Sequence, residues 1–115
     1  MTSTAVAETI FQQLGGGRFV AMTGAKYFVA DANKLNFRIG RNASKANMVV
    51  VELMADDTYT MRFIKHKPYS FKISKDGKSF KETQESFKTV AERQGVYFDM
   101  LQDVFTEVTG MYTHF

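Results

Sequence analysis

The sequence predicts an α+β fold in which an antiparallel β-meander of about five to seven strands is packed by an N-terminal and a C-terminal α-helix. Three observations support this class. Both ends of the chain carry apolar residues at helical spacing, and the middle consists of short segments in which apolar and polar residues alternate. The loops between these segments are too short for the crossovers that parallel strands need. Because a sheet with one apolar face must bury that face, the two terminal helices are its expected cover.

The first helix is expected to begin at Ser3 or Thr4, either of which can cap it, and to end at Leu14. Its apolar face comprises Val6, Ala7, Ile10, Phe11 and Leu14. Three glycines, 15–17, follow and invite comparison with a phosphate-binding loop. Such a loop comes after a strand and carries Lys followed by Ser or Thr, whereas these glycines come after a helix. We therefore interpret them as a helix C-cap and a flexible elbow.

Five strands are expected next, over residues 18–23, 26–30, 35–39, 47–54 and 58–64. The segments 35–39 and 58–64 alternate strictly, as half-buried strands do. Apolar residues fill 47–54 almost throughout, so we place that strand at the centre of the sheet.

The pattern is less regular after Ile64. Residues 69–74 alternate, Asp76-Gly77 is a strong hairpin signal, and 78–82 would be the return strand. Residues 87–92 fit either a last strand or the start of a helix. We favour a strand, because Phe87 and Val90 do not form a sustained helical stripe.

The final helix is expected within 95–112, where Gly110 stands at the position of a left-handed C-terminal cap. Its apolar stripe comprises Tyr97, Leu101, Val104, Phe105 and Val108. We expect the removal of this helix to unfold the protein, because it offers five large side chains to the core.

Length and composition predict one globular domain, residues 1–115, with 44% hydrophobic residues and a core built on phenylalanine. There is no cysteine, no signal-peptide pattern and no apolar run near the roughly 20 residues that span a bilayer. We therefore expect a cytoplasmic protein without disulfides and without a membrane partner.

Little in the sequence indicates catalysis. His66 and His114 stand alone without a zinc-binding spacing, no GxSxG motif is present, and the Asp56-Asp57 pair is typical of a turn. No catalytic residue, metal site or cofactor is therefore expected, although an enzyme with an unrecognised site stays open as an alternative.

Charge is distributed unevenly along the chain. Residues 33–88 hold twelve Lys and Arg against six Asp and Glu, whereas the residues from 89 onward carry a net charge of −3. A basic middle permits an anionic partner, and a solvated lysine-rich face explains the same charge.

Nucleic-acid binding is one hypothesis for this basic middle. The candidate residues are Arg38, Arg41, Arg62 and Lys65. Arg38 and Arg62 occupy polar strand positions, and the other two are expected in loops just beyond strand ends. A sheet that presents such cations beside Tyr or Phe can hold single-stranded DNA or RNA. Against this, the alternating phenylalanines are expected in the core.

Four sequence blocks carry a family resemblance: QQLGGGRFVAMTGAK, RNASKAN with the apolar strand that follows it, DTYTMRF, and GVYFDMLQDVFTEVTGMYT. They resemble segments of small phage and mobile-element proteins of unknown function. The resemblance implies no catalytic residues, and it suggests a bacterial or phage cytosolic setting. Residues 66–85 lie outside these blocks, which is typical of an insertion and leaves open whether they form an ordered hairpin.

Three functional hypotheses follow. The first is a non-catalytic binding module of phage or mobile-element type that engages a protein partner or self-associates as a homo-oligomer. The second is the nucleic-acid binder described above, and the third is the enzyme with an unrecognised site.

Overall fold

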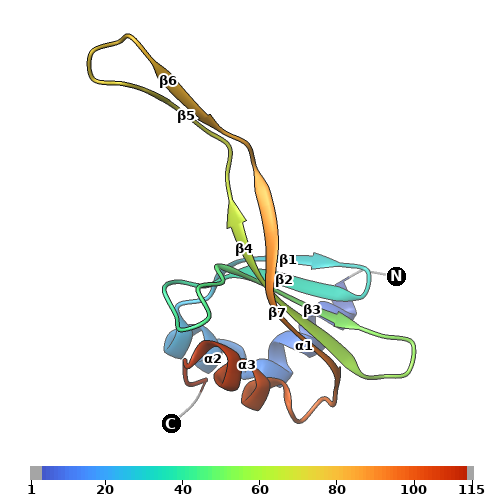
Figure 1. Cartoon of the computed structure of the whole chain (residues 1–115). Helices are drawn as coiled ribbons and strands as arrows, with labels where there is room; N and C mark the ends of the chain where they lie inside the picture. The colour runs from blue at the N-terminus through green and yellow to red at the C-terminus, as the bar shows by residue number, and fades with distance from the viewer. Residues whose placement is uncertain (1–3, 114–115) are drawn as a thin grey trace.

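The computed structural model of the chain describes residues 4–113. The elements follow in the order α1 (Thr4–Leu14), α2 (Gly16–Thr23), β1 (Lys26–Asp31), β2 (Lys34–Arg38), β3 (Met48–Leu53), β4 (Tyr59–Lys67), β5 (Ser70–Ile73), β6 (Phe80–Thr83), β7 (Ser86–Val96) and α3 (Leu101–Thr109). The predicted α+β class, with helices at both ends of the chain, is confirmed (Figure 1). Ser3 and His114 lie outside the described residues.

Five strands form an antiparallel sheet in the order β1-β2-β3-β4-β7. This order follows the chain, so the predicted meander is confirmed, with the nearly apolar β3 at its centre. The three helices lie on one face of the sheet (Figure 1). We call the other face the open face. Strand alternation places Phe37 and Phe63 on the helix side, while their neighbours Arg38 and Arg62 belong to the open face.

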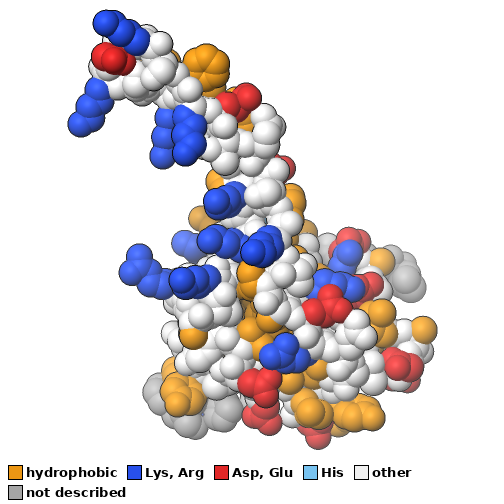
Figure 2. Space-filling model, in the orientation of Figure 1, with side chains coloured by type: hydrophobic (Ala, Val, Ile, Leu, Met, Phe, Trp, Pro, Cys, Tyr) orange, Lys and Arg blue, Asp and Glu red, His pale blue; other side chains and the backbone are white. Residues whose placement is uncertain are grey.

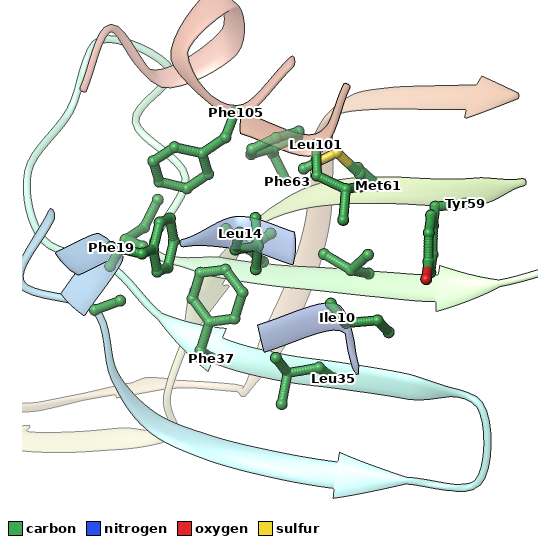
Figure 3. Close-up of a cluster of buried hydrophobic side chains, with 14 of the residues drawn as sticks. Ile10, Leu14, Phe19, Leu35, Phe37, Tyr59, Met61, Phe63, Leu101 and Phe105 are labelled. Atoms are coloured by element: carbon green, nitrogen blue, oxygen red, sulfur yellow. The ribbon is translucent and has the colours of Figure 1, made fainter. Parts of the chain in front are cut away.

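The core between the helices and the sheet is built on phenylalanine, as predicted (Figure 3). Its four fully buried rings come from four different elements: Phe19, Phe37, Phe63 and Phe105. The centroid of the Phe105 ring lies 5.0 Å from that of Phe19 and 6.3 Å from that of Phe63. Phe105 thereby joins α3 to both α2 and the sheet. The α1 side chains of Ile10 and Leu14 complete the contact from the other helix.

The strand predicted over 18–23 is wrong, because this segment is the helix α2. Phe19 and Thr23 are both buried, and their spacing of four residues puts them on one helical face. The Thr23 hydroxyl donates a hydrogen bond of 2.7 Å to the Phe19 carbonyl. Gly24 then ends the helix at φ 71°, and its N–H donates to the Val20 carbonyl. Gly15 therefore joins two helices rather than a helix and a strand, and the other two glycines lie in the first turn of α2.

The final helix is shorter than predicted. Residues 87–92 belong to β7, which confirms the preference for a strand, but β7 continues to Val96 through Gly95 at φ 67°. The helix α3 begins only at Leu101, and Tyr97 is an exposed residue rather than part of its stripe. The predicted left-handed cap is confirmed, since Gly110 has φ 76° and its N–H donates to the Thr106 carbonyl.

Residues 65–88 form a two-stranded extension that we call the β-arm (Figure 1). Its base consists of the ends of β4 and β7, which pair as far as Lys67 and Ser86, after the pairing of β3 with β4 has ended at Ile64. The tip consists of β5 and β6, paired only with each other. The turn forms at Gly77, as the Asp-Gly signal predicts, with φ 71° and a hydrogen bond from its N–H to the Ser74 carbonyl. Residues 66–85 are thus an ordered hairpin, and the arm contributes to a long axis of 55 Å.

The elbow between α1 and α2 gives a first testable prediction. Gly15 has φ 122°, and an added Cβ would lie 2.8 Å from the Gln102 side-chain nitrogen, which donates to the Leu14 carbonyl. Gly15→Ala is therefore expected to lower the free energy of unfolding by about 1–3 kcal/mol. Gly17→Ala is the matched control, because Gly17 lies in α2 with open space around its Cβ position. Alanine there should be neutral or stabilise by up to about 1 kcal/mol. Equal effects of the two variants in denaturant melts would contradict this account of the elbow.

Candidate functional site on the β-arm

The tip of the β-arm has two chemically different faces. In its register Phe71 lies opposite Glu82 and Ile73 lies opposite Phe80, whereas Lys72 lies opposite Lys81. Residues that are directly opposite in an antiparallel pair share a face, and successive residues alternate between faces. The first two pairs therefore lie on one face and the lysine pair lies on the other.

We call Tyr69, Phe71, Ile73 and Phe80 the apolar arm face. The Tyr69 hydroxyl donates a hydrogen bond of 2.8 Å to Glu82, which places this ring over the same side of the hairpin. This hydrogen bond raises the pKa of the Tyr69 phenol. The rings of Phe71 and Phe80 stack with their centroids 5.2 Å apart. These contacts organise the apolar arm face from within.

The apolar arm face is open to solvent. Its four side chains are between 51% and 68% exposed. The alternating phenylalanines are expected in the core, and this expectation is wrong for Phe71. A two-stranded hairpin is at best marginally stable in water by itself. Contiguous exposed apolar side chains of this kind mark interaction sites.

At the base of the arm, Arg38 and His66 meet on the open face. The Arg38 guanidinium donates a hydrogen bond of 2.8 Å to Nδ1 of His66. Because arginine can only donate, Nδ1 carries no proton in this arrangement, and Nε2–H donates to the Glu85 carboxylate, also over 2.8 Å. The exposed Phe87 ring stacks on His66, with the centroids 4.4 Å apart. Arg38 is thus anchored where the arm leaves the sheet.

Asn47 fixes the same junction through its side chain. Its amide nitrogen donates to the His66 carbonyl, and its amide oxygen accepts from the His66 N–H, both over 2.8 Å. The side chain thereby continues the hydrogen bonding of β3 beyond the end of that strand. These two hydrogen bonds hold the base of the arm at a defined place along the sheet.

Arg62 lies in an acidic environment. It forms ion pairs with Glu52 at 2.9 Å and with Glu92 at 3.4 Å, which come from the two neighbouring strands. The hydrogen bond from Arg62 lowers the pKa of the Glu52 carboxyl, although partial burial opposes this effect. The charge of Arg62 is therefore offset locally, which makes it a poor anchor for a phosphate.

The four predicted nucleic-acid-binding residues do not form one surface. Arg38 and Arg62 share the open face but stand on β2 and β4, with β3 between them. Lys65 is exposed on the opposite side of β4 from His66, and it lies within a strand rather than in a loop. Arg41 is exposed in the loop between β2 and β3. Their binding role stays a prediction.

Positive charge instead concentrates on the arm. Residues 65–88 contain seven lysines and three acidic residues. Figure 2 shows basic side chains along the arm and at its base, whereas acidic side chains lie at the opposite end of the body, along its flank and on the arm. Sequence reasoning missed the arm as a unit. The available signals were the Asp-Gly turn and the lysines that flank it on both strands.

The described residues offer little for catalysis. Within residues 4–113, no three His, Asp or Glu side chains come together as metal ligands. A groove of about 950 Å³ lies between α1 and the first two strands, lined by side chains such as Phe11, Phe28 and Leu35. Glu8 is its one ionisable lining residue in the described part of the chain.

Asp56 accepts hydrogen bonds from the N–H and hydroxyl of Thr58, which lower its carboxyl pKa and confirm the predicted turn.

Comparisons with protein families, with curated proteins and with solved structures find no match to this chain. No helix within residues 4–113 has the length and apolar character to cross a bilayer. The geometry of the β-arm is therefore the main guide to function.

Proposed function

We propose that this protein is a non-catalytic binding module that engages a protein partner through the apolar arm face. The observation that carries the proposal is the exposure of four large apolar side chains on one face of a hairpin that projects from the body. Burial of such side chains is worth about 1.5–3 kcal/mol each. A partner that covers this face would gain that energy and stabilise the hairpin as well.

The arrangement of the arm favours a protein surface over a nucleic acid. A platform for single strands combines stacking rings and cations on the same surface. At the arm tip, Phe71 and Phe80 lie on one face, while Lys72 and Lys81 lie on the other. The lysines then keep the unbound arm soluble, and the rings make the contact.

Nucleic-acid binding is the second candidate, favoured by the seven lysines of the arm. A basic two-stranded ribbon has the dimensions to enter the major groove of DNA. In that case the lysine pair would lie against the ligand and the apolar arm face would point away from it. The phage or mobile-element setting suggested by the sequence blocks is compatible with both candidates.

Site-specific photo-crosslinking separates the two candidates. The photoreactive amino acid p-benzoylphenylalanine would replace Phe71 in one variant and Lys72 in another, in the organism that encodes the protein. These neighbours point to opposite faces of the same strand, so each is the control for the other. We expect protein adducts from position 71, in at least fivefold higher yield than from position 72.

Two outcomes would overturn the proposal. The first is an absence of protein adducts at position 71. The second is an adduct pattern dominated by nucleic acid at position 72, which would transfer the proposal to the basic face of the arm.

A further inference from the structure

The end of the molecule opposite the arm carries a second exposed apolar surface. Between β7 and α3, the side chains of Tyr97, Phe98 and Met100 are 41–62% exposed. Exposed carboxylates accompany them at Asp99 and, one turn apart on α3, at Asp103 and Glu107, of which Glu107 is ion-paired with Arg93 at 3.3 Å. Figure 2 shows acidic and apolar side chains together at this end. We call residues 97–107 the acidic patch.

The acidic patch and the arm tip are complementary in two respects. Each combines exposed aromatic rings with charge, and the signs of the charges are opposite. Lys75 and Lys78 are exposed in the turn that joins β5 to β6, beyond the end of the apolar arm face rather than among its rings, so they can meet carboxylates at the rim of a contact that covers the rings. Complementary charge around an apolar contact fixes the register and disfavours wrong partners.

A contact between two arms is less favourable. It would cover the same rings, but it would bring together two hairpins that each carry seven lysines and three acidic residues. Like charges held close together across an interface cost free energy. The acidic patch offers an apolar surface without this repulsion.

We propose that the partner of the arm is a second copy of this chain, and that the apolar arm face of one copy packs on the acidic patch of the next. This inference rests on the proposed function of the arm. The two surfaces lie at opposite ends of the long axis, so the contact joins different copies head to tail (Figure 1). A contact of this type between unlike surfaces builds rings or open chains rather than closed dimers. A single hairpin tip makes a small interface, which is typical of weak, reversible association.

The experiment mixes two variants that are each defective in a different surface. The arm variant carries Phe71→Ser and Phe80→Ser, and the patch variant carries Phe98→Ser and Asp103→Lys. All four residues are exposed, so the core is expected to stay intact, and circular dichroism checks this. If the patch variant fails to fold, a variant that carries only Tyr97→Ser is used in its place. Sedimentation velocity over a micromolar concentration series measures association.

Head-to-tail packing predicts a specific result for each sample. The wild type should form species that grow beyond dimers as its concentration rises. Each variant alone should stay monomeric at a concentration tenfold higher than that at which the wild type associates. An equimolar mixture should form dimers and nothing larger, because one intact arm meets one intact patch.

Three results would overturn the inference. They are a wild type that is monomeric throughout, a patch variant that associates like the wild type, and a mixture that stays monomeric. If the wild type is monomeric but position 71 crosslinks to a different protein, only the identity of the partner is wrong. If position 71 yields no protein adduct, the proposed function fails as well.

Discussion

Phe105→Ala is expected to lower the free energy of unfolding by about 3–5 kcal/mol, the usual range for removal of a fully buried aromatic ring. Phe105 is fully buried and contacts rings from three other elements, Phe19 of α2, Phe37 of β2 and Phe63 of β4. These rings come from both layers of the fold, so local collapse cannot readily fill the cavity. A loss of this size is a large part of the 5–15 kcal/mol typical of whole proteins.

Asp103→Ala is the matched control on the same helix. Asp103 is exposed on the other side of α3, two residues from each of the buried Leu101 and Phe105, and its replacement should change stability by no more than about 0.5 kcal/mol. Urea denaturation followed by circular dichroism measures both variants. Similar, small losses for the two would show that α3 does not anchor the core.

The sequence predicted the parts of the fold in which burial imposes a period over several residues. In β4, Tyr59, Met61 and Phe63 alternate with polar residues, and all three are buried against the helices. At the C-terminal end, the spacing of Leu101 and Phe105 and the cap at Gly110 identified α3. These features are local, so the chain alone is sufficient to reveal them.

Short segments and element boundaries were harder to predict. Residues 18–23 are too few to distinguish the helical period of about 3.6 residues from the strand period of about 2. The spacing of Phe19 and Thr23 fits one face of a helix, and the alternation of polar and apolar residues in the same segment fits a strand. Tyr97 has helical spacing relative to Leu101, but β7 continues to Val96 because that residue pairs with Tyr59. Pairing with a distant strand, rather than local propensity, set this boundary.

The candidate site depends on relations between segments that a pattern does not contain. The residues 69–73 alternate like a core strand. They lie beyond Ile64, where the pairing of β4 with β3 ends, and so they project past the part of the sheet that the helices cover (Figure 1). Similarly, Arg62 was correctly assigned to a polar strand position, but Glu52 and Glu92 neutralise it from other strands. The lysines of the arm were counted in the sequence, whereas their separation from the rings depends on the register of β5 and β6.

Excision of the arm tip is the second prediction with a large expected effect. A two-residue Asn-Gly turn would replace residues 68–85 and join Lys67 to Ser86, which already lie opposite each other. None of the removed residues is buried, so the free energy of unfolding should stay within about 1 kcal/mol of the wild-type value. Association should be lost completely, because the apolar arm face is gone.

Sedimentation velocity of the excised and intact proteins, run side by side at the same micromolar concentrations, tests the central claim most directly. The claim is that the body supplies the fold and the arm supplies the binding. We expect the excised protein to sediment as a single compact monomer at every concentration at which the intact protein associates. Association of the excised protein to the same extent as the intact one, or its sedimentation as an expanded chain, would contradict the account.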